Sequence, residues 1–539
     1  MINPLPVLIV GGGLAGLSSA LLLASQGIKT ILVEKHAGSS PLPRATGFTQ
    51  RSLEIFRSVG IENEIKNESA IKNENAAKNI ANISNQRPRR TKVESLAGVW
   101  QEETPWTPPS DSKPSLPQEY SPCSGVAIAQ DKLEPILYKH AQSLGADIRF
   151  NTRLINFTQD GTCVTARVKN ADGEEYEIKA AYLIAADGHR SPVREALNIG
   201  RTGVGKMKTL RSVLFRADLE KYLEKGISQF EISQPDFNAF LTTYRDGRWV
   251  LMFEDDIERD KATLEKLITQ AIGRNDIAFE IITTGRWELS AFIADKFSDG
   301  RVFLAGDAAH TLPPSRGGYG ANTGIEDAHN LCWKLAAVLT NKASPELLNS
   351  YDQERRSIAW LRHNQIFARP DYSQFANRSE PTTIIEDDAM EFGQRYSSAA
   401  IADANENLPA ALTPSQWAGQ PGTRAPHAWI MRNGEKISTL DLFGKGWVLL
   451  TQNVDWKKSV HEYQKKTPPK TNEIELITHC LHEDFSSENQ TTFSTLFGLS
   501  DNGALLVRPD GYIAWRTQKK PEDDLDALFK SLQTILGDN

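Results

Sequence analysis

Two glycine-rich turns constrain the fold of this chain most strongly, and they lie about 300 residues apart. The first is in VLIVGGGLAGLSSALLLASQG, residues 7–27, and the second is in RVFLAGDAAHTLPPSRGGYGANTG, residues 301–324. In each, a short apolar run predicts a buried strand of a parallel sheet, and glycines follow where the chain turns toward a helix. Such sheets bind ligands at the carboxyl ends of their strands. Two turns of this kind therefore predict one long ligand that is held at both ends.

The first turn has the spacing of a dinucleotide-binding motif. Gly11, Gly13 and Gly16 form G-x-G-x-x-G between the strand and the helix. These positions permit a tight turn, the close approach of a diphosphate and close helix packing, respectively. The helix N-terminus, with Leu14 and Ala15, offers free N–H groups to phosphates. The bland alternative is a glycine-rich turn without a ligand.

Glu34 ends the next predicted strand, 18 residues after Gly16 and directly before Lys35. Its carboxylate can accept hydrogen bonds from both hydroxyls of a ribose, and it would repel a 2′-phosphate. We therefore expect an adenosine diphosphate group at the first turn rather than NADP. A dinucleotide that carries a flavin is the natural candidate for a ligand with a second end.

Two more turns are candidate ligand edges. Asp187-Gly188 in AADGHRSPVR ends a predicted buried strand, although such a turn by itself could be any loop. Gly306-Asp307 ends the strand predicted at 301–305. The Asp307 carboxylate either projects toward a ligand hydroxyl or caps the following turn.

The loop after Asp307 is rich in glycine. Gly317, Gly318 and Gly320 would bring backbone N–H groups close to a planar ligand. A helix expected to start near Asn322 would aim its positive end at the same place. This arrangement suits the negative charge of a reduced flavin.

Composition excludes several other classes. Lysine and arginine total 61 against 68 acidic residues, and the net charge of −7 argues against general binding of nucleic acid. No run of about 18 apolar residues predicts a membrane-spanning helix, and no secretory signal precedes the first strand. The four cysteines are scattered, without a C-x-x-C pair or a metal-ligand spacing. We expect a cytoplasmic protein with no metal and no integral membrane association.

Three motifs in this order make the chain similar to the single-component FAD-dependent aromatic hydroxylases, the family of para-hydroxybenzoate hydroxylase and phenol hydroxylase. The motifs are GGGLAG, ADGHRSPVR and GDAAHTLPP followed by GGYGANTG. The resemblance extends to PRATGFTQRSLEIFRSVG, DAHNLCWKLAAVL and SYDQERR. Near the C-terminus, QPGTRAPHAWI and GALLVRPDGYIAWR resemble the thioredoxin-like domain of phenol hydroxylase and of polyketide-tailoring hydroxylases.

The resemblance implies an α/β fold with three parts. A Rossmann-like FAD-binding domain of the glutathione-reductase type is expected at 1–75, 120–200 and 285–365. A mixed β-sheet substrate-binding domain is expected at 76–119 and 201–284, and a helical linker region at 366–420. A thioredoxin-like domain is expected at 421–539. Because this last part has no C-x-x-C pair, we expect it to serve packing or the assembly of a homodimer rather than thiol chemistry.

The resemblance also implies a monooxygenase of secondary metabolism. NADPH or NADH reduces the FAD, and O2 then adds to the reduced flavin to give a hydroperoxide. A phenolic or polyketide-type aromatic small molecule takes up one oxygen atom from it. Two alternatives stay open: a Baeyer–Villiger or epoxidising flavin monooxygenase, and a flavin-binding protein without oxygenase activity. An NAD-dependent dehydrogenase would leave the second turn unexplained.

The resemblance assigns FAD contacts to both turns and to the loops between them. Arg44 contacts the diphosphate region, Gln130 lies along the cofactor, Asp307 bonds the ribityl chain, and Arg190 is a candidate for the NAD(P)H diphosphate. The full set of expected cofactor-binding residues is Gly11, Gly13, Leu14, Ala15, Gly16, Glu34, Lys35, Arg44, Gln130, Asp187, Gly188, Arg190, Gly306, Asp307, Pro314, Gly317, Gly318, Gly320, Ala321 and Asn322.

The catalytic candidates are Pro314, Arg316, Tyr244 and His310. Pro314 borders the isoalloxazine ring, and Arg316 looks like a one-residue insertion in PPSRGGYG that alters the substrate-side wall. Tyr244 could activate a phenol, and His310 could act as a base or simply pack near its motif. The predicted strands between 211 and 254 carry candidates for either the core or the substrate wall: Phe215, Phe240, Tyr244, Trp249, Met252 and Phe253.

Overall fold

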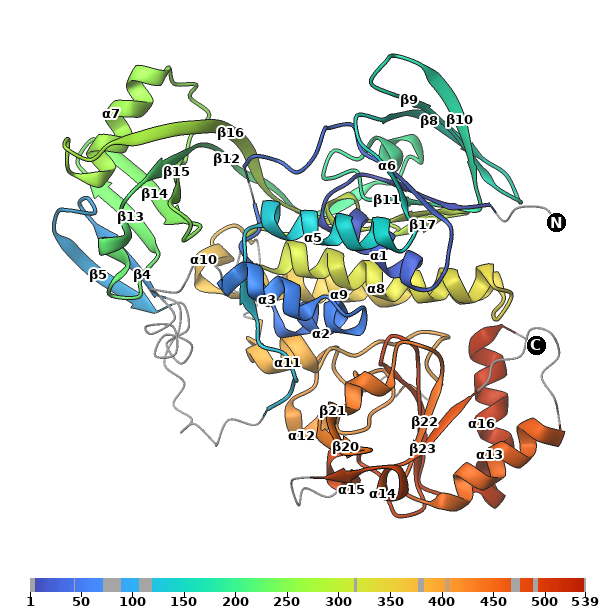
Figure 1. The fold of residues 1–539 in the computed structure, drawn as a ribbon. Coiled ribbons are helices and arrows are strands. Elements are labelled where there is room, and N and C mark those ends of the chain that lie inside the picture. The colour runs from blue at the N-terminus through green and yellow to red at the C-terminus, as the bar shows by residue number, and fades with distance from the viewer. Residues whose placement is uncertain are drawn as a thin grey trace.

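A mostly parallel sheet follows directly from the buried apolar runs, and the rest of the fold is built on it (Figure 1). The computed structural model describes residues 5–42, 44–70, 89–105, 119–314, 318–376, 382–402, 404, 407–466, 476–487 and 493–537. The strand order in this sheet is β17-β18-β11-β1-β2-β7. The strands are β1 (Val7–Val10), β2 (Thr30–Val33), β7 (Asp147–Arg149), β11 (Tyr182–Ala185), β17 (Ser298–Asp299) and β18 (Val302–Leu304).

All neighbours in this sheet are parallel except β17 and β18. The carboxyl ends of β1 and β18 therefore lie at the same edge, as the sequence predicts for the two turns. Helix α1 (Leu14–Ser25) packs against α5 (Gln130–Ser143) and α8 (Tyr319–Leu339). Helix α8 is buried on almost every side, so it is the central helix of the molecule. Helix α9 (Asn349–Ala368) lies against it.

Smaller elements surround this core. They are the hairpin-linked strands β8 (Arg153–Gln159), β9 (Val164–Lys169) and β10 (Glu175–Ala180), the pair β3 (Gly47–Phe48) and β6 (Val126–Ala127), and helices α2 (Gln50–Ser58), α3 (Glu62–Ala70) and α6 (Pro192–Ala196). A turn at Asp172-Gly173 joins β9 to β10, and Gly173 has the left-handed φ of +84° that such a turn requires.

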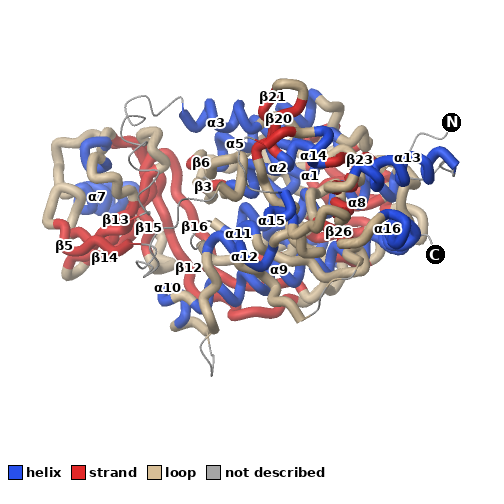
Figure 2. Tube along the Cα trace, turned by 90° about the horizontal axis from the view of Figure 1, so that it is seen from below, coloured by secondary structure: helices blue, strands red, loops and turns tan. Residues whose placement is uncertain are grey.

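An eight-stranded sheet forms a separate lobe, at the left of Figures 1 and 2. Its order is β19-β16-β12-β15-β14-β13-β4-β5. The strands are β4 (Arg89–Val93), β5 (Trp100–Pro105), β12 (Arg201–Ala217), β13 (Gln229–Gln234), β14 (Phe237–Thr243), β15 (Arg248–Phe253), β16 (Phe279–Ala294) and β19 (His310–Thr311). The long antiparallel strands β12 and β16 connect this lobe to the parallel sheet. A hairpin turn at Asp246-Gly247 joins β14 to β15.

Helix α7 (Lys261–Ile272) covers one face of the eight-stranded sheet, and this settles the position of three aromatic side chains. Phe215, Trp249 and Phe253 pack with α7 in the core of the lobe and are at most 2% exposed. Phe240 and Met252 are register partners on the opposite face and are partly exposed. Of the six candidate wall residues, Phe240 and Met252 therefore lie on the face that α7 leaves open, and Tyr244 follows the end of β14.

The C-terminal part is a second α/β unit, drawn in orange and red in Figure 1. Its four-stranded sheet has the order β23-β22-β25-β26, and its three-stranded sheet has the order β21-β20-β24. The elements are β20 (Trp429–Arg432), β21 (Glu435–Ser438), β22 (Val448–Thr451), α13 (Val454–Lys466), β23 (Ile477–Cys480), α14 (Leu481–Asp484), β24 (Ser486–Ser487), α15 (Phe493–Phe497), β25 (Ala504–Val507), β26 (Ile513–Thr517) and α16 (Pro521–Leu536). The segment before it holds the short helices α10 (Pro370–Ser373), α11 (Asp387–Phe392) and α12 (Pro414–Trp417).

A buried charge cluster joins this unit to the central helices. Arg508 donates from Nη1 to Oε1 of Glu354 on α9 at 2.7 Å, and Lys334 Nζ on α8 donates to Glu354 Oε2 at 2.9 Å. All three side chains are 0% exposed. Burial alone would raise the pKa of Glu354, but the charges of Arg508 and Lys334 hold it well below its usual range. Arg508 also pairs with the buried Asp510, so two carboxylates, Glu354 and Asp510, balance the two buried cations Arg508 and Lys334.

The substitution Glu354→Gln is expected to lower the free energy of unfolding by about 3–5 kcal/mol, because Lys334 loses the carboxylate that it contacts and Arg508 keeps only that of Asp510. Urea titration of the purified protein measures this. The matched control is Glu462→Gln, whose partner Lys466 lies 3.6 Å away in an ion pair that is 78% and 67% exposed. That change should cost no more than about 0.5 kcal/mol. Equal effects of the two substitutions would contradict the expectation.

Candidate cofactor and active site

The first glycine-rich turn contains two glycines that close packing requires and one glycine that faces open space. A Cβ on Gly11, which has φ +110°, would lie 2.2 Å from the Ala186 backbone oxygen. A Cβ on Gly16 would lie 1.9 Å from the Gly11 oxygen. For Gly13 the nearest atom, Glu134 Oε1, is 3.9 Å away. Gly13 is also the N-cap of α1, which no side chain caps, so the free N–H groups point into room for an anion.

Glu34 lies at the end of β2, beside this helix N-terminus. Its Oε2 accepts a hydrogen bond from the Gly12 N–H at 2.7 Å, and its Oε1 accepts one from the His36 N–H at 2.8 Å. Lys35, between Glu34 and His36 in the chain, is exposed. The carboxylate thus lies at the edge where the adenosine ribose was expected.

The second turn touches the first. Gly306, with φ +59°, follows β18, and a Cβ there would lie 2.9 Å from Ala15 Cβ on α1. A Cβ on Gly324 of α8 would lie 3.1 Å from the Gly306 Cα and 3.3 Å from Ala15 Cβ. These three small residues let α1, α8 and the second turn meet in van der Waals contact. The two turns therefore belong to one site.

Asp307 and Arg44 face each other across this site. Arg44 Nη1 lies 3.9 Å from Asp307 Oδ2, and the side chains are 65% and 44% exposed. Gln130, the first residue of α5, holds the loop that carries Arg44. It donates its N–H to the Ala45 carbonyl at 2.9 Å and accepts the Ala45 N–H on Oε1 at 3.4 Å. Residues expected at the diphosphate and at the ribityl chain are thus side by side.

The turn after β11 contacts the second glycine-rich turn. Asp187 Oδ2 accepts the Val193 N–H at 3.1 Å, and burial raises the pKa of Asp187. Gly188 has φ +86°. Arg194 donates from Nη1 to the Ala308 carbonyl at 3.1 Å, which ties this turn to the Gly306–Ala308 segment. Arg190 is exposed at the edge of the same turn.

Helix α8 begins at Tyr319, three residues before the predicted start, and its N-terminus carries no side-chain cap. Gly318, the N-cap, has φ +60°, and Gly320 and Ala321 form the first turn. The Asn322 side chain is buried and bonds protein groups. Its Oδ1 accepts from the Thr49 N–H at 3.1 Å and from Ser52 Oγ at 2.6 Å. The expected contacts of Arg316 and Gly317 lie outside the described residues.

The catalytic candidates are placed very differently. His310 is 0% exposed, and its Nε2 lies 2.7 Å from Asp327 Oδ2, which favours a structural role over that of a base. Tyr244 follows β14, and burial raises its pKa to about 12. The guanidinium of Arg248 lies 5.2 Å from its ring centre and pairs with Asp131 of α5 at 2.8 Å. The Pro314 carbonyl accepts a hydrogen bond from the Tyr372 hydroxyl at 2.5 Å.

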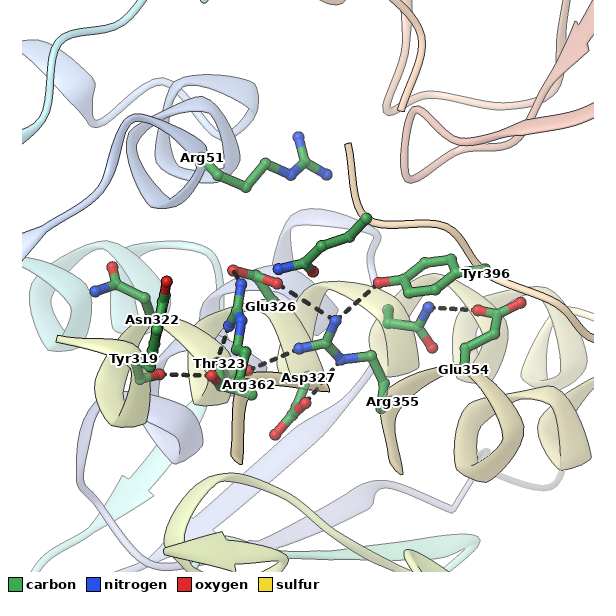
Figure 3. Close-up of polar contacts among 12 residues, drawn as sticks. Arg51, Tyr319, Asn322, Thr323, Glu326, Asp327, Glu354, Arg355, Arg362 and Tyr396 are labelled. Carbon is green, nitrogen blue, oxygen red and sulfur yellow. Dashed lines mark hydrogen bonds and ion pairs between the residues drawn. The ribbon is translucent and has the colours of Figure 1, made fainter. Parts of the chain in front are cut away.

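The sequence analysis did not predict the buried charges between α8 and α9 (Figure 3). Asp327 accepts hydrogen bonds from the Gly306 N–H and from Arg355, and it is fully buried. Burial would raise its pKa, but His310 and Arg355 hold it at about 2. The segments DAHNLCWKLAAVL and SYDQERR, quoted for the resemblance, contain both partners. Charged residues spaced along two otherwise apolar helices are the sequence pattern that could have indicated buried ion pairs.

The geometry defines a dinucleotide-binding flavoprotein. An uncapped helix N-terminus with open space, a carboxylate at the ribose end and an exposed Asp307 beside Arg44 fit the phosphate, ribose and ribityl groups of FAD. A family model described as FAD binding domain matches residues 4–365, and one described as aromatic-ring hydroxylase, C-terminal, matches residues 418–539. The chain belongs to this family of FAD-dependent aromatic-ring hydroxylases, and it is a flavoprotein monooxygenase.

Three known proteins illustrate the relationship. Tetracenomycin A2 monooxygenase-dioxygenase of Streptomyces glaucescens is 38% identical over 99% of this chain and 97% of its own length. The 4-methyl-5-nitrocatechol 5-monooxygenase of a Burkholderia species is 35% identical over 98% and 97%. The solved structure of aklavinone-11 hydroxylase with FAD and aklavinone has a TM-score of 0.83 and 33% identity, and the match covers 100% of both chains. The predicted α/β fold class and the FAD cofactor are confirmed.

No described helix is both long and apolar enough to cross a membrane. No group of three or more His, Cys, Asp or Glu side chains within the described ranges is placed to hold a metal ion.

The substitution Gly13→Ala is expected to separate cofactor binding from folding. The protein has room for the methyl group, but the group enters the space in front of the α1 N-terminus, so FAD should bind about tenfold more weakly or worse, a loss of about 1.4 kcal/mol. Fluorescence titration of the apoprotein with FAD measures the affinity, and thermal unfolding of the apoprotein should stay unchanged. The matched control is Gly446→Ala, where the nearest atom is 4.0 Å away in the C-terminal unit. Unaltered FAD affinity in Gly13→Ala would contradict this placement of the diphosphate.

Proposed function

We propose that this protein inserts one oxygen atom into a phenolic or polyketide-type aromatic compound, with NADPH or NADH as reductant. The proposal rests on one cofactor site, in which Arg44 lies 3.9 Å from Asp307 and follows Leu42, which contacts the face of the eight-stranded sheet opposite α7. When bound, FAD accepts electrons from the nicotinamide and activates dioxygen. The protein's own tasks are to bind, to orient and to exclude water.

The first turn and its helix hold the diphosphate, and Glu34 holds the adenosine ribose. Asp307 is 44% exposed and free to accept a hydrogen bond from the ribityl chain. The uncapped N-terminus of α8 stabilises negative charge that develops at the reacting ring. Arg190, exposed on the neighbouring turn, receives the diphosphate of the nicotinamide cofactor.

The substrate lies against the face of the eight-stranded sheet opposite α7. That face meets the loop before Arg44, since a Cβ on Gly285 would lie 2.3 Å from Leu42 Cδ2. Phe240 and Met252 are register partners there and offer an apolar wall for an aromatic ring. Tyr244, from the hairpin beside this face, orients the substrate by a hydrogen bond.

The activity is tested with the purified flavoprotein, NADPH or NADH, and 18O2 in turn with single-ring phenols and with polyketide-type polycyclic phenols. We expect the aromatic substrate to accelerate nicotinamide oxidation and the product to gain one labelled hydroxyl oxygen. A labelled lactone or ester would indicate Baeyer–Villiger chemistry, and a labelled epoxide would indicate epoxidation. Flavin binding without substrate-stimulated oxygen transfer across the whole panel would overturn the proposal.

Tyr244 provides a test that depends on pH. Because burial raises its pKa to about 12, the phenol keeps its proton at neutral pH and cannot accept one from the substrate. Tyr244→Phe is expected to lower kcat about tenfold, the effect of one lost hydrogen bond. The shape of the pH profile between about pH 6 and pH 9 should stay the same, as should FAD affinity. Loss of a basic limb that the wild type shows would contradict this role.

A further inference from the structure

A stacked pair of tyrosines links the C-terminal unit to the central helices. Tyr512 follows the turn at Pro509–Gly511, and its ring lies 4.1 Å from the ring of Tyr396 at an interplanar angle of 19°. Tyr396 belongs to the segment between α11 and α12 and is 2% exposed. The guanidinium of Arg508 lies 5.5 Å from the Tyr396 ring centre and 5.7 Å from that of Tyr512. The contact is therefore a tightly packed part of the domain interface.

The hydroxyl of Tyr396 continues this connection into α9 (Figure 3). It accepts a hydrogen bond from Arg355 Nη1 at 2.9 Å. The same guanidinium donates from Nε to Asp327 Oδ1 at 2.8 Å and from Nη2 to the Thr323 carbonyl at 3.2 Å. Arg355 and Asp327 are 0% exposed, so no water competes for these bonds. Nη1 also donates to Glu326 Oε2 at 3.3 Å, so the Arg355 plane is held by the Tyr396 hydroxyl and by three groups of α8, those of Thr323, Glu326 and Asp327.

Asp327 carries the connection to the cofactor site. Its second oxygen, Oδ2, accepts the Gly306 N–H at 3.1 Å and faces His310 Nε2 at 2.7 Å. Gly306 is the residue directly before Asp307. A movement of the Asp327 carboxylate therefore displaces the backbone that presents Asp307 to the cofactor.

A second arginine of α9 fixes the start of α8. Arg362 donates from Nη2 to Glu326 Oε1 at 2.6 Å and from Nη1 to Thr323 Oγ1 at 2.5 Å, and it covers the Tyr319 ring at 5.4 Å. Arg355 and Arg362 balance the carboxylates of Glu326 and Asp327, so the four charges sum to zero inside the protein. Such a cluster holds one geometry because each carboxylate would be buried unpaired in any other.

We propose that the C-terminal unit positions the flavin end of the FAD site through a chain of contacts from Tyr512 to Tyr396, Arg355, Asp327 and Gly306. This gives the C-terminal unit, which has no C-x-x-C pair, a task in cofactor binding. The proposal needs only FAD binding at the two turns and goes beyond the proposed substrate and reaction. Tyr396, Arg355 and Asp327 act here as positioning residues, because none of them reaches the cofactor itself.

The first test compares Tyr396→Phe with Ser398→Ala in the full chain. Tyr396→Phe removes the hydroxyl that holds Arg355 and keeps the ring that stacks on Tyr512. Ser398→Ala removes a hydrogen bond of 2.6 Å to Glu354 in the same interface, away from Asp327. We expect a similar fall in melting temperature for both. Only Tyr396→Phe should weaken FAD binding, by about tenfold, and shift the visible spectrum of the bound flavin.

The second test asks whether the effect starts in the C-terminal unit. Tyr512→Leu removes the ring that supports Tyr396, and it should raise the Kd for FAD several-fold. The matched control is Tyr463→Leu, which breaks another stacked pair of the same unit, with Phe529 at 3.9 Å, far along the chain from Tyr396. That control should leave FAD affinity and the flavin spectrum unchanged.

Two results would overturn the proposal. One is wild-type FAD affinity and spectrum in both Tyr396→Phe and Tyr512→Leu. The other is an equal loss of FAD affinity in the controls Ser398→Ala and Tyr463→Leu, which would mean that general destabilisation explains the effect. Both readouts are independent of turnover, so they also separate this proposal from a failure of the proposed reaction.

Discussion

The contact of Ala15, Gly306 and Gly324 is the constraint on which the rest of the structure depends. A Cβ on Gly306 or Gly324 would lie only 2.9–3.3 Å from its nearest neighbours in this contact. Any side chain at these glycines, or one larger than a methyl group at position 15, would therefore push α1, α8 and the second turn apart. This contact joins the N-terminal turn to a turn about 300 residues later. Insertion of a whole lobe between them is tolerated because the closure entropy of a loop grows only with the logarithm of its length. The paired strands β12 and β16 lead the chain out and back.

The close contact of these small residues buries backbone groups that need hydrogen-bond partners, and the buried charges provide them. Backbone groups at a tight turn need hydrogen-bond partners when α1 and α8 exclude water. The Gly306 N–H finds one in Asp327, and the charge of Asp327 in turn requires Arg355. Arg355 has further donor groups, and the Thr323 carbonyl, Glu326 and the Tyr396 hydroxyl accept from them. The polar cluster between α8 and α9 is therefore a consequence of the close approach of α1, α8 and the turn at Gly306.

The sequence predicted the elements whose pattern is local. The strands around 7–10 and 302–304 and the glycines of both turns follow from apolar periodicity and turn chemistry. The roles of Asp327 and Arg355 could not be predicted in this way, because a charged residue on a helix is usually exposed. Only the placement of α9 and the C-terminal unit around α8 buries them. The same reasoning applies to Phe215 and Trp249, whose face of the strand depends on where α7 packs.

The two lobes are connected by ion pairs of unequal strength. Near α5, Arg248 bonds Asp131 and Asp246 with side chains only 10%, 18% and 8% exposed. Near α10, Arg90 approaches Asp371 at 3.7 Å, where the side chains are 31% and 66% exposed. Because water screens the exposed pair far more than the buried one, the connection beside α5 is the firmer of the two. That connection is made by the residue next to Gln130, which holds the loop of Arg44, so the eight-stranded lobe is held most firmly near the cofactor site.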